Sequence, residues 1–577
     1  MMSRERPLLT PVCYAGELKQ FVEAVLMASH EYGPNLSYGS VNLIGRPSNF
    51  PNYGDHTDSY LLSSYGEWPR LAPSYRPEFG LARVAPCDNP PVDEFFVASF
   101  EQAVYPAELG VYETLHPGTV RRITCYVVKV GWLCLWDDRT DKRQDIAGDR
   151  GASPSRLFLP TLRTVPHRTR VLRFELNLRD HRYISGLDGI ILVGGVHDFP
   201  EARGKALAAA AASASPTPSP PPVEAAAALE LIGQGAGGTG QPNLTDMPYE
   251  ILYHILSHLD WFALADVEKV CVRCAEVVAD ARLYREVNLR PYWDRVDSYF
   301  LMWLGNRCAG INKLDLSGCG IVNEFSKIDL QIFFNRHGHT LTHLRLNCIG
   351  VRHAMSFVLL LCPELTELCM QNAVLDNQHY QPSVCKRLTT LDLSRAQYAP
   401  ETLLGLLQQN PNLQHLSLAS CDQSSLPDIT HTIGEHNRAL LSLKLWKTHV
   451  LGAHGLVPLQ HCTKLQELDL GYSNHEDCAE GTLARLAAAC PDLRWLVLGG
   501  FRGITNNDLL AIARHCPRLQ YLDLMSSVML SGEAINAIFI GCPALRLLEL
   551  SYCSGIEQQW LDMWRRQFPH VDVKHQY

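Results

Sequence analysis

The chain has 577 residues, of which 46% are hydrophobic and 19% are charged, the balance of an ordinary globular protein. Its formal net charge of −9 argues against a nucleic-acid-binding protein, which carries a strong basic patch. No run reaches the ~18 apolar residues of a membrane-spanning helix. Residues 1–10 carry Arg4, Glu5 and Arg6 and no apolar run follows, so no secretory signal is expected. The 19 cysteines are therefore expected to be mostly free thiols inside the cell.

Residues 14–197 form a first globular region, in which hydrophobic runs alternate with turns. At its start, apolar residues recur three and four positions apart between Leu18 and Leu26, a spacing that predicts a helix. Later runs are rich in β-branched and aromatic residues and are separated by turns with Pro or Gly, a pattern typical of an antiparallel β-sandwich. These predicted strands cover residues 95–100, 122–128, 171–176 and 189–194.

A linker is predicted at residues 198–240. The stretch 206–228 is mostly Ala, Ser and Pro, and a Gly-rich stretch follows at 233–240. This composition lacks the apolar side chains that offset chain entropy, and its prolines interrupt any helix that the alanines would form. We expect the linker to be flexible.

Residues 241–290 predict three short helices in a compact unit. Pro248 suits the first turn of the first helix, with Thr245 or Asp246 as its N-cap, and Asp260 is expected to cap the second helix. Such a small unit cannot bury all of its apolar surface alone, which indicates a protein partner. The apolar stripe on the first helix consists of Ile251, Ile255 and Leu259.

A phrase of the form Leu-x-x-Leu-x-Leu returns ten times between residues 300 and 577, at intervals of 23 to 30 residues, with Ile311 starting the first unit and only Leu365 and Leu368 in the third. This period matches leucine-rich repeats. Each unit is expected to supply a strand whose leucines point into a shared core and a helix on the convex side, with Thr505 capping one such helix. The middle leucines of the ten units are Leu314, Leu344, Leu368, Leu391, Leu416, Leu443, Leu468, Leu496, Leu522 and Leu548.

A cysteine recurs at the end of the predicted repeat helices, as in Cys490-Pro491 and Cys516-Pro517. Such cysteines either bind metal or form redox pairs, or they are small apolar fillers at the helix end. One cysteine per repeat lacks the Cys-x-x-Cys spacing of a zinc site, which favours packing. Cys271 and Cys274 do have that spacing, but no second pair lies nearby, so neither a metal nor a redox site is predicted there.

The segment 241–290 resembles the F-box, whose pattern is a Leu-Pro-x-Glu start, an Ile/Leu-rich helix and a Val-Cys-x-x-Trp stretch. Met247 replaces the first Leu here, and Cys274 stands at the Trp position. An F-box followed by leucine-rich repeats is similar to the F-box and leucine-rich-repeat protein family. The runs at 38–45 and 100–106 extend this resemblance to a mitochondria-associated member in animals. The resemblance implies an N-terminal discoidin or galactose-binding-like β-sandwich, a three-helix F-box and an α/β leucine-rich-repeat horseshoe.

The resemblance also implies a function. In this family the F-box binds an adaptor that leads to the cullin and RING subunits of an SCF-type ubiquitin ligase, and the repeats hold the protein to be degraded. The chain would be a non-catalytic substrate receptor without a cofactor, located in the cytoplasm, the nucleus or at the mitochondrial outer membrane, with mitophagy receptors as targets. The implied adaptor contacts are Leu244, Met247, Pro248, Ile251, Ile255 and Leu259.

The target is expected on the concave face of the repeats, where side chains alternate with the buried leucines. Asp315, Asp392, Asp469 and Asp523 share one position in this pattern, and a role in the repeat consensus is favoured over ligand contact. The candidate target contacts are Arg345, Lys444, Trp446, Glu467, Trp495, Tyr521 and Glu549.

The sequence leaves alternatives to the substrate-receptor function. One alternative is a leucine-rich-repeat binding scaffold without ligase activity. A hydrolase or metal enzyme is disfavoured, because His337 and His339 lack a third ligand at a suitable spacing and the sequence has no Gly-x-Ser-x-Gly, P-loop or His-Glu-x-x-His motif. In the N-terminal region, Tyr53, His56, Trp68 and His116 lie in predicted loops and could bind a sugar, although a protein-contact or folding role is favoured there.

Overall fold

The computed structural model comprises the whole chain, and its description covers the following residues: 17–29, 39–54, 56, 59–62, 87–88, 91–128, 130–139, 155–178, 185–196, 247–323, 325–349, 357–375, 384–421, 426–448, 455–473, 481–501 and 503–575. The predicted linker at 198–240 lies outside them. The chain divides into two compact units. The first comprises residues 1–214, 417–431 and 440–577, and the second comprises residues 215–416 and 432–439. None of the helices in the described ranges is long and apolar enough to cross a membrane.

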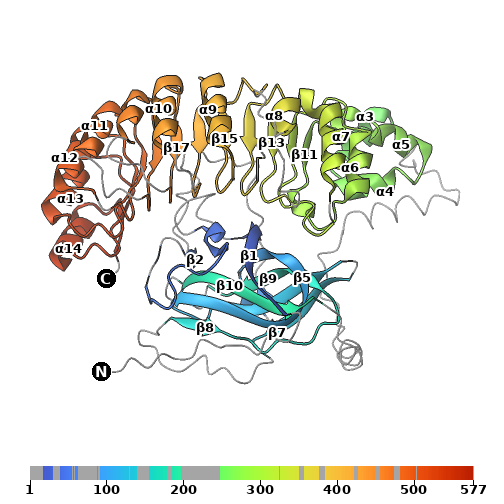
Figure 1. Cartoon of the computed structure of the whole chain (residues 1–577), viewed down its shortest axis with the longest axis horizontal. Coiled ribbons are helices and arrows are strands. Elements are labelled where there is room, and N and C mark those ends of the chain that lie inside the picture. Colours follow the sequence, from blue (N-terminus) through green and yellow to red (C-terminus); the bar gives the residue numbers. More distant parts are fainter. Residues whose placement is uncertain are drawn as a thin grey trace. The chain divides into compact units, whose positions relative to one another are not determined.

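The N-terminal region forms an antiparallel β domain (Figure 1). Its eight-stranded sheet has the order β2-β10-β1-β5-β9-β6-β7, with β8 paired to β5. The long strand β5 pairs with β1, β8, β9 and β10, so it holds the whole domain together. The strands are β1 (Glu17–Ala28), β2 (Tyr60–Leu62), β5 (Glu94–Leu115), β6 (Val120–Val127), β7 (Gly131–Asp137), β8 (Arg156–Phe158), β9 (Thr169–Leu176) and β10 (Ser185–Gly195), with a separate two-stranded ribbon of β3 (Cys87–Asp88) and β4 (Pro91–Val92).

The segment predicted as a helix at residues 18–26 is a strand, β1. Every second residue from Gln20 to Ala28 is buried, which is the period of a strand and not of a helix. Gln20 and Ala24 are among the buried positions, and neither is strongly apolar, so the apolar residues alone suggested the wrong period. Gln20 is satisfied there by hydrogen bonds to the backbone of Gln102 in β5 (2.8 and 2.9 Å).

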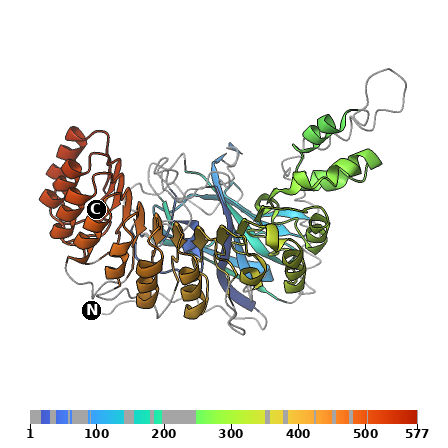
Figure 2. The same ribbon diagram turned by 90° about the horizontal axis from the view of Figure 1, so that it is seen from above.

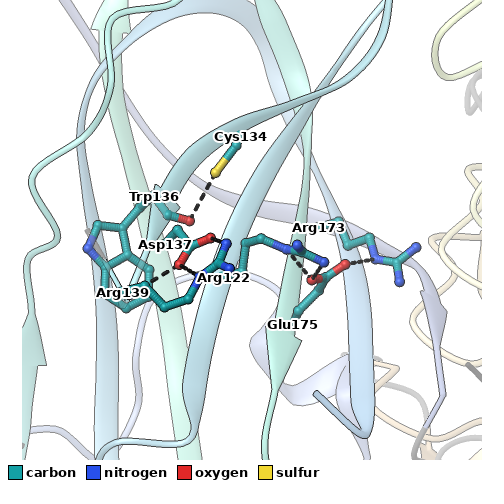
Figure 3. Close-up of polar contacts among 7 residues, drawn as sticks. All are labelled: Arg122, Cys134, Trp136, Asp137, Arg139, Arg173 and Glu175. Carbon is teal, nitrogen blue, oxygen red and sulfur yellow. Dashed lines mark hydrogen bonds and ion pairs between the residues drawn. The ribbon is translucent and has the colours of Figure 1, made fainter. Parts of the chain in front are cut away.

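Charged side chains on β6 and β9, and at the end of β7, form two groups of opposite charges (Figure 3). Glu175 lies between Arg122 (Nη2–Oε2, 2.5 Å) and Arg173 (Nε–Oε1, 3.1 Å). Asp137 accepts a hydrogen bond from Nε of Arg139 at 2.8 Å. Paired charges with multiple hydrogen bonds indicate a structural role for this cluster in the β domain.

The F-box segment folds into helices α3 (Tyr249–Leu256), α4 (Trp261–Val267) and α5 (Val272–Val278). Asp260 caps α4 as predicted, accepting hydrogen bonds from the amides of Phe262 (2.9 Å) and Ala263 (2.7 Å). The first helix begins one residue later than expected, because Pro248 is its N-cap and makes no side-chain capping bond. Thr245 and Asp246 lie outside the described residues. The buried core of the three helices is Leu252, Leu256, Leu264, Val267, Cys274, Val277 and Val278.

The repeats form one twelve-stranded sheet, with the strands in sequence order from β11 to β22 and helices along one side of it (Figure 1). Ten strands match the ten predicted units. The first and last strands lie beyond the leucine pattern, because valines (Val287, Val573) occupy their central positions. The strands are β11 (Glu286–Asn288), β12 (Lys313–Asp315), β13 (His343–Arg345), β14 (Glu367–Cys369), β15 (Thr390–Asp392), β16 (His415–Ser417), β17 (Ser442–Lys444), β18 (Glu467–Asp469), β19 (Trp495–Val497), β20 (Tyr521–Asp523), β21 (Leu547–Glu549) and β22 (Asp572–Lys574).

The repeat helices stack side by side, which Figure 2 shows most clearly for the C-terminal repeats. Thr505 caps α12 as predicted, in a reciprocal capping box with Asp508. Cysteines at the helix ends, among them Cys490 and Cys516, are fully buried, and Sγ of Cys516 lies 3.6 Å from the carbonyl oxygen of Ala487. The helices are α6 (Ser298–Gly305), α7 (Lys327–His337), α8 (Phe357–Leu361), α9 (Pro400–Gln409), α10 (Leu426–His436), α11 (Thr482–Ala489), α12 (Asn506–His515), α13 (Gly532–Gly541) and α14 (Gln558–Gln567).

Candidate functional site

The F-box exposes a row of apolar side chains on α3. Ile251 and Ile255 are one helical turn apart and are 50% and 36% exposed, and Pro248 before them is also exposed. Val272, at the start of α5, is 77% exposed. The core of the unit is filled from the other side of α3, by Leu252 and Leu256, and among the described residues the exposed row takes no part in that core.

The remaining predicted adaptor contacts lie at the edges of this row. Met247 and Leu259 are half-buried, and Leu259 packs against the F-box core. Leu244 lies outside the described residues. Thus Pro248, Ile251 and Ile255 form the accessible centre of the predicted adaptor-binding surface, and the buried leucines of the same helix support it.

The Cys-x-x-Cys pair has a local structural role. Sγ of Cys271 accepts a hydrogen bond from the amide of Cys274 at 3.3 Å and so caps α5. Cys274 itself is fully buried, and burial raises the pKa of its thiol to about 11. Across the described ranges, no group of three or more His, Cys, Asp or Glu side chains is arranged to hold a metal ion.

The F-box is joined to the first repeats by aromatic and charged contacts. Phe262 of α4 stacks on Phe300 of α6 with ring centroids 4.3 Å apart. Glu268 accepts a hydrogen bond from the indole nitrogen of Trp303 (2.7 Å) and forms an ion pair with Arg307, whose guanidinium also lies over the Trp303 ring at 4.5 Å. Trp303 packs against the F-box core, so the F-box and α6 share one hydrophobic interior.

The repeated acids on the concave face have a common backbone partner. Asp315, Asp392, Asp469 and Asp523 each accept a hydrogen bond, between 2.8 and 3.0 Å, from the amide two residues later. The residue three positions after the acid, such as Ser526 for Asp523, has a left-handed backbone with φ near +60°. That conformation is costly for a residue with a Cβ, and the carboxylate helps to hold the turn. Sequence reasoning missed two further members of this set, Asn288 and Glu549.

The predicted target contacts largely pair with each other or with neighbouring repeats. Arg345 forms an ion pair with Glu367 (2.5 Å), and Lys444 forms one with Glu467 (3.1 Å). The Trp495 and Tyr521 rings stack with centroids 4.2 Å apart. Except for Arg345, which is half-buried, the candidate contacts are buried. The buried candidates are Lys444, Trp446, Glu467, Trp495, Tyr521 and Glu549.

Within the first compact unit, two leucines of the β domain contribute to this burial. Leu61 of β2 and Leu115 of β5 belong to one buried cluster with residues of the C-terminal repeats. Leu115 ends the long central strand, and Leu61 pairs with Gly186 of β10. The repeat members of the cluster are Trp495, Val497, Tyr521, Met525 and Leu547, with Tyr552 packed against it.

Buried acids lie on the same strand as Tyr521 and on the neighbouring strands of the aromatic pair. Burial raises the pKa of Asp469 to about 7 and that of Asp523 to about 8. Burial also raises the pKa of Glu549, which lies opposite Asp523 in the register of β20 and β21. Carboxyl groups that lose water without gaining a full charge partner favour the protonated form. The concave face of β18–β21 is therefore acidic in composition and shielded from solvent.

The aromatic loop residues of the β domain lie partly together. The rings of Tyr53 and His116 meet edge to face with centroids 6.0 Å apart, and Nε2 of His56 lies 3.2 Å from the carbonyl oxygen of Asn52. Trp68 lies outside the described residues. These contacts are consistent with a folding role, and the predicted sugar site and the discoidin-like description of this domain remain predictions.

Comparison with known proteins is consistent with this geometry. A family model for F-box-like sequences matches residues 244–290, and a model described as the LRR repeats of an FBD-associated F-box protein matches residues 454–563. These matches confirm the predicted combination of an F-box with leucine-rich repeats, and this combination defines the class of the protein.

Within that class, the chain is similar to F-box/LRR-repeat protein 4 of Bos taurus. The two are 29% identical over 515 residues, which cover 85% of this chain and 81% of that protein. Among solved structures, an LRR protein of Leptospira interrogans shares 18% identity over 47% of this chain and 62% of its own, with a TM-score of 0.32. The yeast complex of Rad7 and Elc1 shares 13% identity over 56% of this chain and 90% of the matched chain, with a TM-score of 0.34.

Proposed function

We propose that this chain is the substrate-recognition subunit of an SCF-type ubiquitin ligase, in which the F-box binds the adaptor and the repeats bind the protein to be degraded. The observation that carries the proposal is the exposed row of Pro248, Ile251 and Ile255 on α3. An exposed apolar stripe beside a complete core is typical of a surface that a partner helix covers.

In this function the chain contributes proximity and no reacting group. Binding both partners raises the local concentration of target lysines near the ubiquitin-loaded enzyme, and partner subunits carry out the transfer. The F-box joint supports this role, because the stacking of Phe262 on Phe300 and the Glu268 contacts hold the adaptor-binding surface on the first repeats.

The test is co-purification of the full-length chain with the adaptor–cullin complex, comparing Ile251→Asp with Ser257→Asp. Both substitutions add a carboxylate next to or within α3, but Ser257 is an exposed polar residue that follows the apolar row. Burying an unpaired charge in an interface costs several kcal/mol, so Ile251→Asp should lower adaptor affinity by about 100-fold or more. Ser257→Asp should bind like the wild type.

Equal recovery of the adaptor by both variants, or failure of the wild type to recover it, would favour the alternative, a leucine-rich-repeat scaffold without ligase activity. A target-binding role for Arg345, Lys444, Trp446, Glu467, Trp495, Tyr521 and Glu549 remains part of the proposal.

A finer proposal rests on the family resemblance alone: the targets are mitophagy receptors of the mitochondrial outer membrane. It predicts that depletion of this protein raises the abundance of such receptors without raising their transcripts. Unchanged receptor half-lives after depletion would remove this finer proposal and leave the ligase function standing.

A further inference from the structure

A concave strand face is normally the open surface of a leucine-rich-repeat array, and in this chain part of it is closed. Strands β14 and β16 to β21 have all three of their residues buried, whereas the end strand β22 has an exposed first residue. Only the central residue of such a short strand faces the core of the repeats. The flanking residues are therefore shielded by other side chains on the concave side, such as Arg345 over Glu367 and Lys444 over Glu467.

For β19 to β21, the described cover comes from this chain's own β domain. Leu61 and Leu115 join the stacked pair of Trp495 and Tyr521 in one buried cluster. A Cβ on Gly54 would lie 3.8 Å from the hydroxyl oxygen of Tyr552, which places a second segment of the β domain against the same repeats.

The covered surface has the composition of a binding site. It combines two large stacked aromatic rings with the carboxyl groups of Asp469, Asp523 and Glu549. Of the nearby cations, Lys444 is paired with Glu467, and Lys574, opposite Glu549 in β22, is paired with Asp572. Aromatic anchors at the centre of a concave face and acids around them suit a segment that carries both apolar and basic side chains.

We propose that the β domain is a lid on the concave face of β19–β21, and that a basic, partly apolar segment of a partner protein binds this face after the lid is displaced. The nature of that partner as a degradation target rests on the proposed function. The lid itself does not, because it follows from contacts within the chain.

Hydroxyl-radical footprinting of the full-length protein tests the lid, because Trp, Tyr and Met side chains react according to their solvent access. Leu115→Asp on the β domain and Leu547→Asp on β21 should each raise the oxidation of Trp495, Tyr521 and Met525 at least fivefold. Val130→Asp, at an exposed hairpin tip of the β domain, is the matched control and should leave all three protected.

Two internal probes separate opening of the lid from unfolding. Trp136 is buried within the β domain and Trp564 within the last repeats, and both should stay protected in the opened variants. Should Leu115→Asp also expose Trp136, Leu547→Asp still decides the question from the repeat side. Wild-type protection of Trp495 and Tyr521 in Leu547→Asp, or high oxidation of both in the wild-type protein, would overturn the lid.

Binding of a basic, partly apolar segment to the opened face is tested with a synthetic peptide of alternating leucine and lysine or arginine residues. The control is the same peptide carrying glutamate in place of the basic residues. The basic peptide should bind the Leu115→Asp variant at least tenfold more tightly than the wild type, and Trp495→Ala in the opened variant should abolish the gain. Equal binding to closed and opened protein, or equal binding of both peptides, would reject the proposed occupant. Adaptor co-purification is measured on the same variants. Loss of adaptor binding would count against the proposed ligase function, whereas the footprints report only on the lid.

Discussion

The indole nitrogen of Trp303 in α6 donates a 2.7 Å hydrogen bond to the carboxylate of Glu268, which follows α4. This bond, together with the Arg307 ion pair, crosses from the F-box to the first repeats. Glu268→Ala would leave the Trp303 and Arg307 donors without their acceptor, at a cost of about 1–3 kcal/mol. We expect a lower urea midpoint for this variant.

The control for this joint is Asp266→Ala, which removes a carboxylate whose ion pair with Lys269 is solvent-exposed. Such surface pairs contribute less than about 1 kcal/mol. Equal urea midpoints for the Glu268 and Asp266 variants would show that the joint does not depend on Glu268.

The repeat cysteines should be inert in the folded protein. Burial raises the pKa of the Cys490, Cys516 and Cys542 thiols to about 12, so at pH 8 almost none is in the reactive thiolate form. Alkylation with iodoacetamide followed by mass spectrometry should label these three only after denaturation. Cys348, which is half-buried, is the comparison within the same protein. Rapid native labelling of Cys516 would contradict the packing role.

Stability should fall as the pH rises from about 4 to 8. The usual pKa of Asp is about 3.9, and burial raises those of Asp469 and Asp523 to about 7 and 8. The folded protein thus holds these protons more tightly than the unfolded chain does. The resulting stabilisation is complete below about pH 4 and is lost as the pH rises through 7 and 8, by up to roughly 1.4 kcal/mol per pH unit for each group.

Asp523→Asn tests this dependence, because the amide keeps an oxygen for the Met525 amide and does not ionise. Urea denaturation at pH 5 and pH 8.5 should show a smaller loss of stability in this variant than in the wild type. Asp492→Asn, at an exposed carboxylate paired with Arg518, should keep the wild-type slope. Identical slopes for wild type and Asp523→Asn would indicate that Asp523 is not buried in solution.

Cys274 fills the F-box core at the position where the family pattern has Trp. Cys274 is fully buried there, and Trp303 of α6 packs against the same cluster. Cys274→Trp should therefore overpack the core and cost about 1–3 kcal/mol, whereas Cys274→Val should cost less than about 1.5 kcal/mol. Thermal unfolding of the two variants makes the comparison, and a more stable Cys274→Trp protein would show that this space is not filled.

The repeats and the F-box could be predicted because each has a strong local pattern. Ten leucine phrases at a steady interval identify the sheet, and the N-cap Asp260 and the buried face of α12 follow from single helices. The pattern failed at β1, where buried Gln20 and Ala24 carry no hydrophobic signal. For the repeated acids, the sequence favoured a role in the repeat consensus but did not identify their partners, since only the structure shows their bonds to the backbone.

The covering of Trp495 and Tyr521 could not be predicted from the sequence. Leu61 and Leu115 are ordinary strand residues far away along the chain, and no periodicity connects them with the repeats. Contacts between distant segments depend on the shapes of two finished domains, which a single sequence does not encode in any local pattern.

The carboxylate and amide caps have a consequence for how this surface can diversify. Where the third residue of a strand must hold the following turn, its identity is restricted, and the first residue is the position left to vary. In the six strands whose third residue is such a cap, a substitution at the first position therefore leaves the turn in place. The first residues of these strands are Glu286, Lys313, Thr390, Glu467, Tyr521 and Leu547.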